Sequence, residues 1–568
     1  MPEIIKVDFD KKQRLAIEVP YKLNSVARGI PARWSKTQQR WIAPLLRGSI
    51  RVLENASKMP GVEVRYSPEV RAAIDEYESR LAVGPEKFPL GYQFKMEPRP
   101  YQREALDFVW PRAAVALGLE MGCGKTKVTI DTAAARFLGG QIQQMLVMCP
   151  SSIVSTWAEE IKKHCPIRAK IHFELPREPN PEEFQILVVS TEGLGISLKA
   201  FDRAADFVRR APTLSIVDES SWIKEQKAMR SQRSHLIGAA SKYRMILNGT
   251  LINNSPLDLW SQYQFLDPNI LGQEWYDFRA QHAIFGGFQG RQILATMRMD
   301  EVVRDVAPWT LIIKKADVLK DLPPKIYERR EVQPTPEQKA LIKEIKKKPL
   351  HVELPPEIAV GNVQARMVLE RVLRQRQIAA GFVSYLTDED MAEGRREPRI
   401  ARLKKSPKTE ETMAVLEQTA GKAVIWCTFT EEVEAIRDAI AEVYGPKSVV
   451  TFYGKMTKEE QDEARHRLQE DPTCRFFVGN MAVGAIGITL TAASTEIYHS
   501  NSFSYLQRAQ SEDRLHRLGQ LNAVTIVDIV MKGTADELCF DAVMEKRDVA
   551  EFITGAIHES RLKQLEVS

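Results

Sequence analysis

Short runs that are apolar on both faces recur along the chain, and they limit its possible folds more than any other feature. The runs are MLVMC (145–149), ILVVS (186–190), LSIVD (214–218), YRMIL (243–247), AVIWC (423–427), RFFVG (475–479) and VTIVDIV (524–530). Such runs suit strands of a parallel sheet that is covered by helices on both faces. The segments between them, for example KVTIDTAAARFL (127–138), have helical spacing. Alternating strands and helices predict a doubly wound α/β fold.

The strands cluster in 113–250 and 423–530, and the sequence between these clusters is mostly helical and charged. We therefore expect two α/β lobes with a helical insertion between them and a small α+β unit before them. The segment DLPPK (321–325) predicts an extended linker, because paired prolines cannot continue a helix. The expected divisions are an N-terminal unit, a first lobe, a linker with the insertion, and a second lobe with C-terminal helices (1–88, 89–312, 313–408 and 409–568).

Composition excludes several classes of protein. Of the 568 residues, 44% are hydrophobic and 27% are charged, as in an ordinary soluble domain protein. No apolar run approaches the ~18 residues that span a bilayer, and the first residues lack an apolar signal core. The six cysteines are scattered with no C-x-x-C pair, which predicts reduced thiols, a cytoplasmic setting and no zinc site.

The net charge of +5 is small, but basic residues are concentrated in two places. Residues 1–60 hold 12 Lys and Arg against 5 Asp and Glu. The segment RREPRIARLKKSPK (395–408) holds seven basic residues and one acidic residue. Basic patches favour phosphate backbones, although a solvated surface explains either patch equally well.

The segment LEMGCGKT (119–126) predicts a phosphate-binding loop between a strand and a helix. Gly122 and Gly124 leave room for backbone N–H groups to approach a phosphate, and the helix N-terminus adds its positive dipole end. Lys125 would reach the β- and γ-phosphates of ATP, and the Thr126 hydroxyl would hold Mg²⁺. Leu119 stands where the usual G-x-x-x-x-G-K-[ST] pattern has its first glycine, so a glycine-rich turn without a ligand is the alternative.

Two further groups of residues fit the same chemistry. Asp218 and Glu219 end the apolar strand LSIVDE, at the strand edge where α/β sites lie. Asp218 would bind Mg²⁺ through water, and Glu219 would orient or deprotonate the attacking water. Arg514 and Arg517 are three residues apart, which predicts one shared helical face aimed at a γ-phosphate. A surface basic helix is the alternative for the arginines.

These elements, in this order, resemble the Swi/Snf family of superfamily-two helicase-like ATPases over about residues 96–545. The matching segments are RPYQREAL (99–106), LEMGCGKT, MCPSSIVSTWAEEIKKHCP (148–166), STEGL (190–194), DESSWIK (218–224), NGTLINNSPLDLWSQYQFLDPNILG (248–272), KADVLKDLPPK (315–325), VIWCTFT (424–430), GNMAVGAIGITLTAA (479–493) and QSEDRLHRLGQ (510–520). The family also lacks the first glycine of the loop, which accounts for Leu119. The resemblance implies two RecA-like lobes.

The resemblance also implies a set of nucleotide-binding residues, with Gln102 reading the adenine. They are Gln102, Met121, Gly122, Cys123, Gly124, Lys125, Thr126, Gly487 and Gln510. The sequence departs from the family pattern at Ser221, at Leu251 of the coupling motif Asn248–Leu251, and at Ala485, which follows Gly484. None of these departures removes a catalytic group. The resemblance implies that all of them lie in segments that couple the state of ATP to DNA binding. We therefore expect them to affect this coupling and not the hydrolysis of ATP.

The implied function is an ATP-dependent translocase on double-stranded or branched DNA, in fork remodelling, recombination or repair. We expect a compact bacterial or viral form that works as a monomer, with protein partners at replication or recombination sites. The alternatives are a strand-separating helicase, a catalytically silent DNA-binding scaffold and an RNA-directed ATPase. The catalytic set argues against the scaffold, and the form of QSEDRLHRLGQ disfavours the RNA enzyme.

The N-terminal unit contains KVDFDKKQRLAIEV (6–19), which predicts a hairpin with a basic turn. Trp34 and Trp41 lie seven residues apart, with Lys36 and Arg40 between them. The unit weakly resembles the HARP-type module of some annealing helicases, which implies contact with branched or single-stranded DNA. The alternative, which we favour for the tryptophan pair, is that both form the core of a small domain.

Overall fold

The computed structural model describes most of the chain and divides it into two compact units. The described residues are 2–11, 14–30, 32–43, 45, 47–81, 86–175, 182–249, 255–286, 292–319, 321–347, 363–385, 399–484 and 488–567. One unit holds 1–318 with 549–568, and the other holds 319–548. The six cysteines are all described and buried, and none forms a disulfide. No helix in the described ranges is long and apolar enough to cross a membrane.

The N-terminal residues form a small α+β unit with a mixed five-stranded sheet. Its strands are β1 (Glu3–Phe9), β2 (Leu15–Glu18), β3 (Arg33–Ser35), β4 (Arg40–Ala43) and β5 (Val62–Tyr66), in the order β3-β4-β2-β1-β5. Helices α1 (Asn24–Gly29), α2 (Arg47–Ser57) and α3 (Pro68–Leu81) complete it. Strands β1 and β2 pair antiparallel, which confirms the predicted hairpin.

The two tryptophans of this unit face each other on neighbouring strands. Trp34 of β3 is paired with Trp41 of β4, and their rings meet edge to face at 5.6 Å between centroids. Trp41 packs against the core, but Trp34 is 46% exposed. The expectation that both are core residues is therefore wrong for Trp34, because its strand, β3, is the edge strand of the sheet and lies farther from the core than β4.

The first lobe is built on a seven-stranded parallel sheet. Its order is β14-β6-β11-β10-β7-β9-β8, from β6 (Ala114–Leu119), β7 (Gln144–Cys149), β8 (Ala169–His172), β9 (Phe184–Ser190), β10 (Thr213–Asp218), β11 (Tyr243–Leu247) and β14 (Thr310–Ile313). Every predicted apolar run of this half is one of these strands. The strands β6, β7 and β10 are buried along their whole length.

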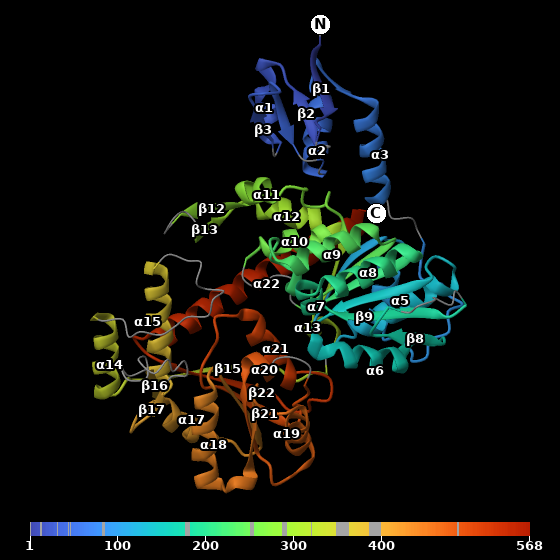
Figure 1. Ribbon diagram of the computed structural model, residues 1–568. Helices are drawn as coiled ribbons and strands as arrows, with labels where there is room; N and C mark the ends of the chain where they lie inside the picture. The colour runs from blue at the N-terminus through green and yellow to red at the C-terminus, as the bar shows by residue number, and fades with distance from the viewer. Residues whose placement is uncertain are drawn as a thin grey trace. The chain divides into compact units, whose positions relative to one another are not determined.

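Helices cover this sheet on both faces, which confirms the doubly wound prediction. The helices of this lobe are α4 (Pro100–Val109), α5 (Lys125–Leu138), α6 (Val154–His164), α7 (Thr191–Ile196), α8 (Leu198–Arg210), α9 (Met229–Ala240), α10 (Asp258–Leu266), α11 (Trp275–His282), α12 (Met299–Val306) and α13 (Lys315–Val318). Figure 1 shows α6 on one side of β8 and β9, and α8 on the other. A hairpin of β12 (Ala283–Gly286) and β13 (Gln292–Thr296) follows α11.

The second lobe has a six-stranded parallel sheet in the order β15-β22-β21-β18-β20-β19. Its strands are β15 (Lys325–Val332), β18 (Lys422–Cys427), β19 (Val449–Phe452), β20 (Phe476–Asn480), β21 (Ala493–Tyr498) and β22 (Val524–Met531). Its helices are α17 (Pro407–Gln418), α18 (Thr430–Tyr444), α19 (Lys458–Glu470), α20 (Met481–Gly484), α21 (Tyr505–Leu515) and the long α22 (Ala535–Val567). The insertion contributes α14 (Pro336–Lys347), α15 (Val363–Ala379) and the hairpin of β16 (Phe382–Tyr385) and β17 (Arg399–Arg402).

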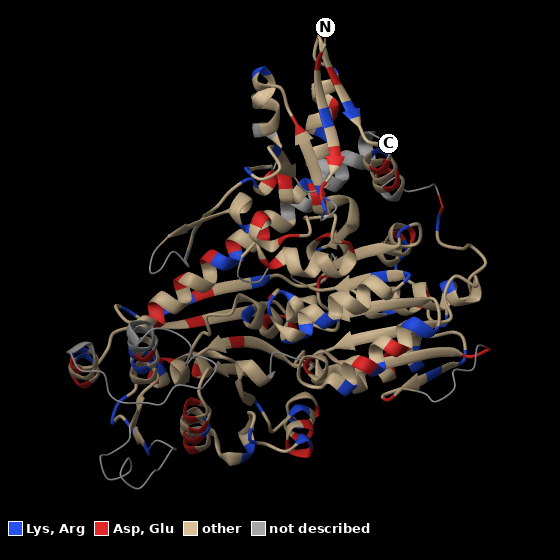
Figure 2. Cartoon of the chain, turned by 45° about the horizontal axis from the view of Figure 1, so that its top comes forward, with Lys and Arg blue, Asp and Glu red and all other residues tan. Residues whose placement is uncertain are grey.

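Strand β15 falls in the range 313–408 that the sequence assigned to the linker and insertion. Its sequence, KIYERREV, has no apolar run because it is an edge strand with mostly exposed side chains. The second sheet therefore takes its edge from residues that precede the insertion. Figure 2 shows the same contrast in charge, since the central strands carry few charged residues and the helices carry many.

A buried carboxyl group lies inside the second lobe. Trp426 Nε1 donates to Glu496 Oε1 at 2.6 Å, and the Tyr498 hydroxyl donates to the same oxygen at 3.0 Å. Glu496 is fully buried, and burial, with a smaller effect of Glu512, raises its pKa to about 8. The folded lobe therefore holds this group protonated near neutral pH.

Replacing Glu496 by Gln should remove a pH dependence of stability. Below the ordinary pKa of 4.5 the carboxyl is protonated in both folded and unfolded chains. As pH rises toward about 8, only the unfolded chain loses the proton. The free energy of unfolding of the wild type therefore falls by about 1.4 kcal/mol per pH unit. Thermal midpoints measured from about pH 5 to 8 should fall less in Glu496→Gln than in wild type. The exposed change Glu459→Gln should follow wild type, and parallel curves for all three proteins would refute the assignment.

Candidate active site

The phosphate loop joins the end of β6 to the start of α5. Gly122 has a φ of 86° and Gly124 a φ of 83°, a region that L-residues rarely adopt. The first N–H groups of α5 have no partner within the helix, and they carry its positive dipole end. The loop therefore has the backbone shape and the polarity of a phosphate cradle. Leu119 is the last residue of β6, and its fully buried side chain packs in the core of the lobe instead of lining the loop.

Gln102 of α4 is buried and braces this loop. Its Nε2 donates to the Cys123 carbonyl at 3.1 Å, and its Oε1 accepts from the Arg99 backbone N–H at 2.9 Å. A Cβ on Gly124 would lie 2.2 Å from Gln102 Nε2, so a side chain at this position would displace the Gln102 amide from the loop. The structure thus places Gln102 on the loop. The Cys123 side chain is buried, and its backbone N–H closes a turn onto the Glu120 carbonyl at 3.1 Å.

Lys125 and Thr126 begin helix α5 and are partly exposed. The Lys125 Nζ donates to the Leu119 carbonyl at 2.8 Å, so the ammonium group folds back over the loop. A phosphate in the loop would offer this ammonium a charged acceptor in place of a neutral carbonyl, which is the stronger partner.

Asp218 and Glu219 follow from β10, at the same carboxyl edge of the sheet as the loop. Trp157 Nε1 of α6 donates to Asp218 Oδ2 at 2.7 Å, and the Glu219 N–H donates to Asp218 Oδ1 at 3.0 Å. Burial raises the pKa of Asp218, and the nearby Lys125 ammonium opposes that shift. Both carboxylates are buried, and a nearby cation is what keeps a buried Asp ionised.

Glu219 adopts the left-handed conformation, with a φ of 51° and a ψ of 58°. For a residue other than glycine this costs about 1–3 kcal/mol and is typical of functional positions. The surrounding structure therefore fixes Glu219 in a turn immediately after the strand.

The coupling motif contacts this site from the next strand. Ser220 Oγ donates to Gln262 Oε1 at 2.5 Å, and Asn248 Nδ2 donates to Ser220 Oγ at 3.4 Å. A Cβ on Gly249 would lie 3.2 Å from the Met121 side chain. The end of β11 is thus packed against both the phosphate loop and the Asp218 turn. Thr250, Leu251 and Ala485 lie outside the described residues.

Arg514 and Arg517 lie in the second compact unit, and they do not share a helical face as predicted. Helix α21 ends at Leu515, so Arg514 is in its last turn and Arg517 lies beyond it. The Arg514 guanidinium donates to the carbonyls of Gln510 at 3.1 Å and Ile488 at 3.2 Å. Arg517 donates to Thr489 Oγ1 at 2.9 Å.

Both arginines therefore donate to neighbouring residues, Arg514 to Ile488 from the last turn of α21 and Arg517 to Thr489 from beyond the helix. Gln510 is a buried residue of α21, on the same helix as Arg514. Gly487, the other nucleotide-binding residue expected in this lobe, lies outside the described residues.

The sequence named Trp157 only as part of a family segment and did not pair it with Asp218. No local pattern could have paired them, because the contact depends on β7 and β10 being neighbours in the sheet, so that the helix after β7 reaches the end of β10. Gln262 was not singled out either, and only the packing of α10 against β11 brings it to Ser220.

The residues present fit a magnesium nucleotide. The cradle has two glycines with positive φ, one ammonium group, one hydroxyl group at Thr126 and a buried carboxylate at Asp218. Hydroxyl and carboxylate oxygens are ligands that Mg²⁺ prefers.

Replacing Gly124 by Ala should weaken nucleotide binding, because the new Cβ would displace the Gln102 amide from the loop that it braces. We expect the affinity for a fluorescent ATP analogue to fall at least about tenfold, which is about 1.4 kcal/mol. Gly140→Ala is the matched control, since Gly140 also has a positive φ of 66° but nothing within 4 Å of its Cβ position. Equal losses in the two variants would show that backbone strain, and not the fit to Gln102, is responsible.

Comparison with known proteins identifies the family of the chain. Residues 101–382 match the family model described as SNF2-related domain, and residues 404–519 match the helicase conserved C-terminal domain. The TATA-binding protein-associated factor mot1 of Aspergillus fumigatus is 24% identical over 526 residues, 83% of this chain and 27% of that protein. The DNA annealing helicase and endonuclease ZRANB3 of Homo sapiens is 22% identical over 530 residues, 90% of this chain and 44% of that protein.

The chain thus spans about a quarter of the length of the first relative and under half of the second. Among solved structures, the Sulfolobus solfataricus SWI2/SNF2 ATPase core in complex with dsDNA is 24% identical, with a TM-score of 0.37, covering 85% of this chain and 98% of that one. The two family models together take in about seven-tenths of the residues, in the order that the site requires. The chain belongs to the Swi/Snf family of superfamily-two helicase-like ATPases.

Proposed function

We propose that the chain is an ATP-driven translocase on double-stranded or branched DNA, used in fork remodelling, recombination or repair. One observation carries the ATPase part of this proposal. The glycine loop, Asp218 and Glu219 come from distant parts of the sequence and end at the carboxyl edge of one parallel sheet. This edge is where open α/β sheets bind their ligands.

In the proposed mechanism the N–H groups at the start of α5 hold the phosphates of ATP, and Lys125 exchanges the Leu119 carbonyl for them. Thr126 and Asp218 would hold Mg²⁺, which supplies charge neutralisation for the departing phosphate. Trp157 fixes the orientation of the Asp218 carboxylate through its indole N–H. Gln102 keeps the loop in the shape that the phosphates require.

Glu219 is the proposed base for the attacking water. It follows Asp218 directly, and its left-handed backbone conformation turns the chain away from the extended path of β10. Arg514 and Arg517 belong to the other compact unit. Their proposed role, contact with the γ-phosphate, therefore comes from the family resemblance. Arg514 donates to the Ile488 carbonyl and Arg517 to the Thr489 hydroxyl, and a phosphate is a stronger acceptor than either of these neutral oxygens.

The DNA part of the proposal rests on charge and on the relatives. Two of the relatives carry the printed description of DNA annealing helicase, and none of the departures in this chain removes a catalytic group. In the second basic segment, Arg399 and Arg402 lie on β17, whose residues are all exposed. Lys404 and Lys405 follow it, so the strand could track a phosphate backbone. A monomeric state, protein partners at forks and a cytoplasmic setting belong to the same proposal.

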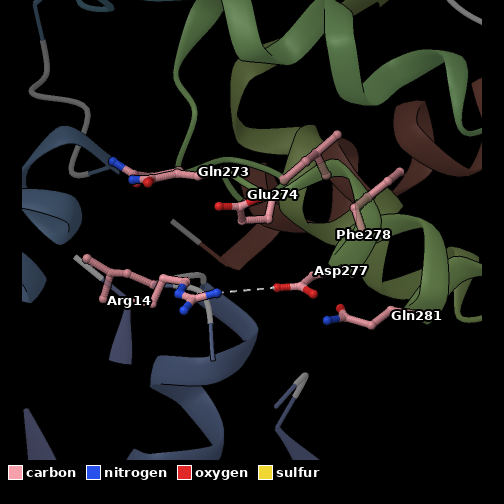
Figure 3. Close-up of a pocket in the computed structure, with 10 residues that line it drawn as sticks. Arg14, Gln273, Glu274, Asp277, Phe278 and Gln281 are labelled. Carbon is pink, nitrogen blue, oxygen red and sulfur yellow. Dashed lines mark hydrogen bonds and ion pairs between the residues drawn. The ribbon is translucent and has the colours of Figure 1, made fainter. Parts of the chain in front are cut away.

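The N-terminal unit is proposed to guide branched DNA to the motor. It is seated on the first lobe near α11, where Arg14 lies 4.0 Å from Asp277 (Figure 3). Arg14 is itself held by Asp10 at 2.6 Å. A small pocket lies at this contact, lined by Arg14 and Leu45 on one side and by side chains from 269–281 on the other. The half-exposed Trp34 supplies an aromatic face on which an unpaired base could stack.

ATP turnover with different nucleic acids tests the proposal. At one salt concentration, duplex or forked DNA should stimulate turnover more than single-stranded DNA or duplex RNA. Lys125→Ala should lose turnover with every one of them, because the loop loses its cation, while the exposed change Lys170→Ala should not. Stimulation by single strands alone would favour a strand-separating helicase, and normal turnover in Lys125→Ala would place the ATP site elsewhere.

Glu219→Gln should separate ATP binding from hydrolysis. The amide has nearly the same shape but cannot take a proton, so we expect turnover to fall about 10²–10⁴-fold with little change in ATP affinity. Single-turnover hydrolysis and equilibrium binding of an ATP analogue measure the two properties. Glu225→Gln, at an exposed position close by, should match wild type. Loss of binding together with turnover would make Glu219 a structural residue.

A further inference from the structure

The helix that carries Arg514 is tied to the inter-lobe linker through a buried carboxylate. Glu512 of α21 is buried, and its two oxygens accept from three groups on two elements. Oε1 accepts from Arg508 Nε at 2.7 Å, while Oε2 accepts from Lys325 Nζ at 2.9 Å and from the Tyr327 hydroxyl at 2.8 Å. Lys325 is the first residue of β15, where the linker enters the second lobe.

A second carboxylate anchors the same cluster to the centre of the sheet. Arg508 is fully buried and donates to both oxygens of Asp528 on β22, at 2.5 and 2.8 Å. It also donates to Asn501 Oδ1 at 2.8 Å. The buried Arg508 and the partly buried Lys325 therefore face two buried carboxylates across β15, α21 and β22.

The charges in this cluster stabilise one another. Burial alone would raise the pKa of Glu512, but Lys325 and Arg508 lower it to about 2. Burial alone would lower the pKa of Lys325, but Glu512 and Asp513 raise it above its ordinary value. Buried ion pairs seldom increase net stability, and their best-attested use is to fix one arrangement of the elements that carry them.

His516 provides a second tie, just past the end of α21. Its Nε2 lies 2.7 Å from the Pro323 carbonyl, and because a carbonyl can only accept, Nε2 is the donor. The next linker carbonyl, that of Pro324, accepts from the Val524 N–H of β22 at 3.1 Å. The paired prolines have no N–H of their own, so side chains and β22 hold this part of the linker.

The residues that make the two ties, Glu512 and His516, flank Arg514 in the sequence, and Arg517 directly follows His516. We propose that His516 and Glu512 are positioning residues, which make the end of the linker and the arginine-bearing segment one rigid body. Any displacement of the linker then moves Arg514 and Arg517 with it. This inference rests on the proposed function, because it assigns the two ties to the placement of the γ-phosphate arginines.

The test pairs His516→Ala with His516→Gln in the full-length protein. The glutamine amide can still donate to Pro323 from a similar position, whereas alanine cannot. We expect His516→Ala to lower DNA-stimulated kcat about tenfold or more with the KM for ATP changed less than about twofold. His516→Gln should regain at least half of the lost kcat. Tyr327→Phe, which removes one donor to Glu512, should lower kcat in the same direction by a smaller factor.

Amide hydrogen exchange supplies a readout that does not need turnover. In His516→Ala, amides of 321–332 should exchange faster than in wild type, while those of 422–427 should not change. His466→Ala, an exposed histidine on α19, should leave both kcat and exchange at wild-type values.

Two results would overturn the inference: wild-type kcat in His516→Ala, or no recovery in His516→Gln when both variants melt like wild type. A wild-type protein with no ATP turnover would instead contradict the proposed function. In that case the exchange measurement alone decides whether the tie between His516 and the linker exists.

Discussion

Parallel pairing of the strands is the constraint on which the rest of the molecule depends. In a parallel sheet all carboxyl ends lie at one edge, so residues distant in sequence meet there without any contact between their own segments. In the first lobe this rule brings the loop after β6 and the turn after β10 to the same edge. The strands are buried on both faces, and the free energy gained by burying their apolar side chains offsets the cost of gathering polar groups at that edge.

Polar side chains then fix the edge in one shape. Gln102 lies so close to Gly124 that a Cβ there would displace its amide, and Trp157 donates to the Asp218 carboxylate from the helix after β7. Ser220 extends the same network to the coupling motif through Asn248 and Gln262. The departures from the family pattern around Ser221 lie beside this network, while the groups that would contact phosphate are all retained. In the second lobe, Glu512 is a buried carboxylate in the same way as Asp218, and it accepts from donors on β15 and on its own helix.

The apolar runs and the glycine loop were enough to predict the strands that carry the site. They could not give β15 or β21, because KIYERREV and ASTEIY lack continuous apolar character. β15 is an edge strand, so many of its side chains contact solvent and need not be apolar. β21 is a central strand, but it can bury the polar Glu496 because Trp426 donates a hydrogen bond to the carboxyl group. The spacing of Arg514 and Arg517 suggested one helix, but α21 stops at Leu515 and Gly519 follows with a φ of 98°. The pairing of Trp157 with Asp218 depends on strand order, which no local pattern contains.

The most direct test of the central claim is a structure of the protein with ADP, beryllium fluoride and Mg²⁺. The account predicts that the phosphates lie at the N-terminus of α5, with the Lys125 Nζ moved from the Leu119 carbonyl to the phosphate oxygens. Mg²⁺ should lie near Thr126 and Asp218, with the Asp218 carboxylate still accepting from Trp157. A nucleotide bound elsewhere, or a bound nucleotide with Lys125 still donating to Leu119, would contradict it.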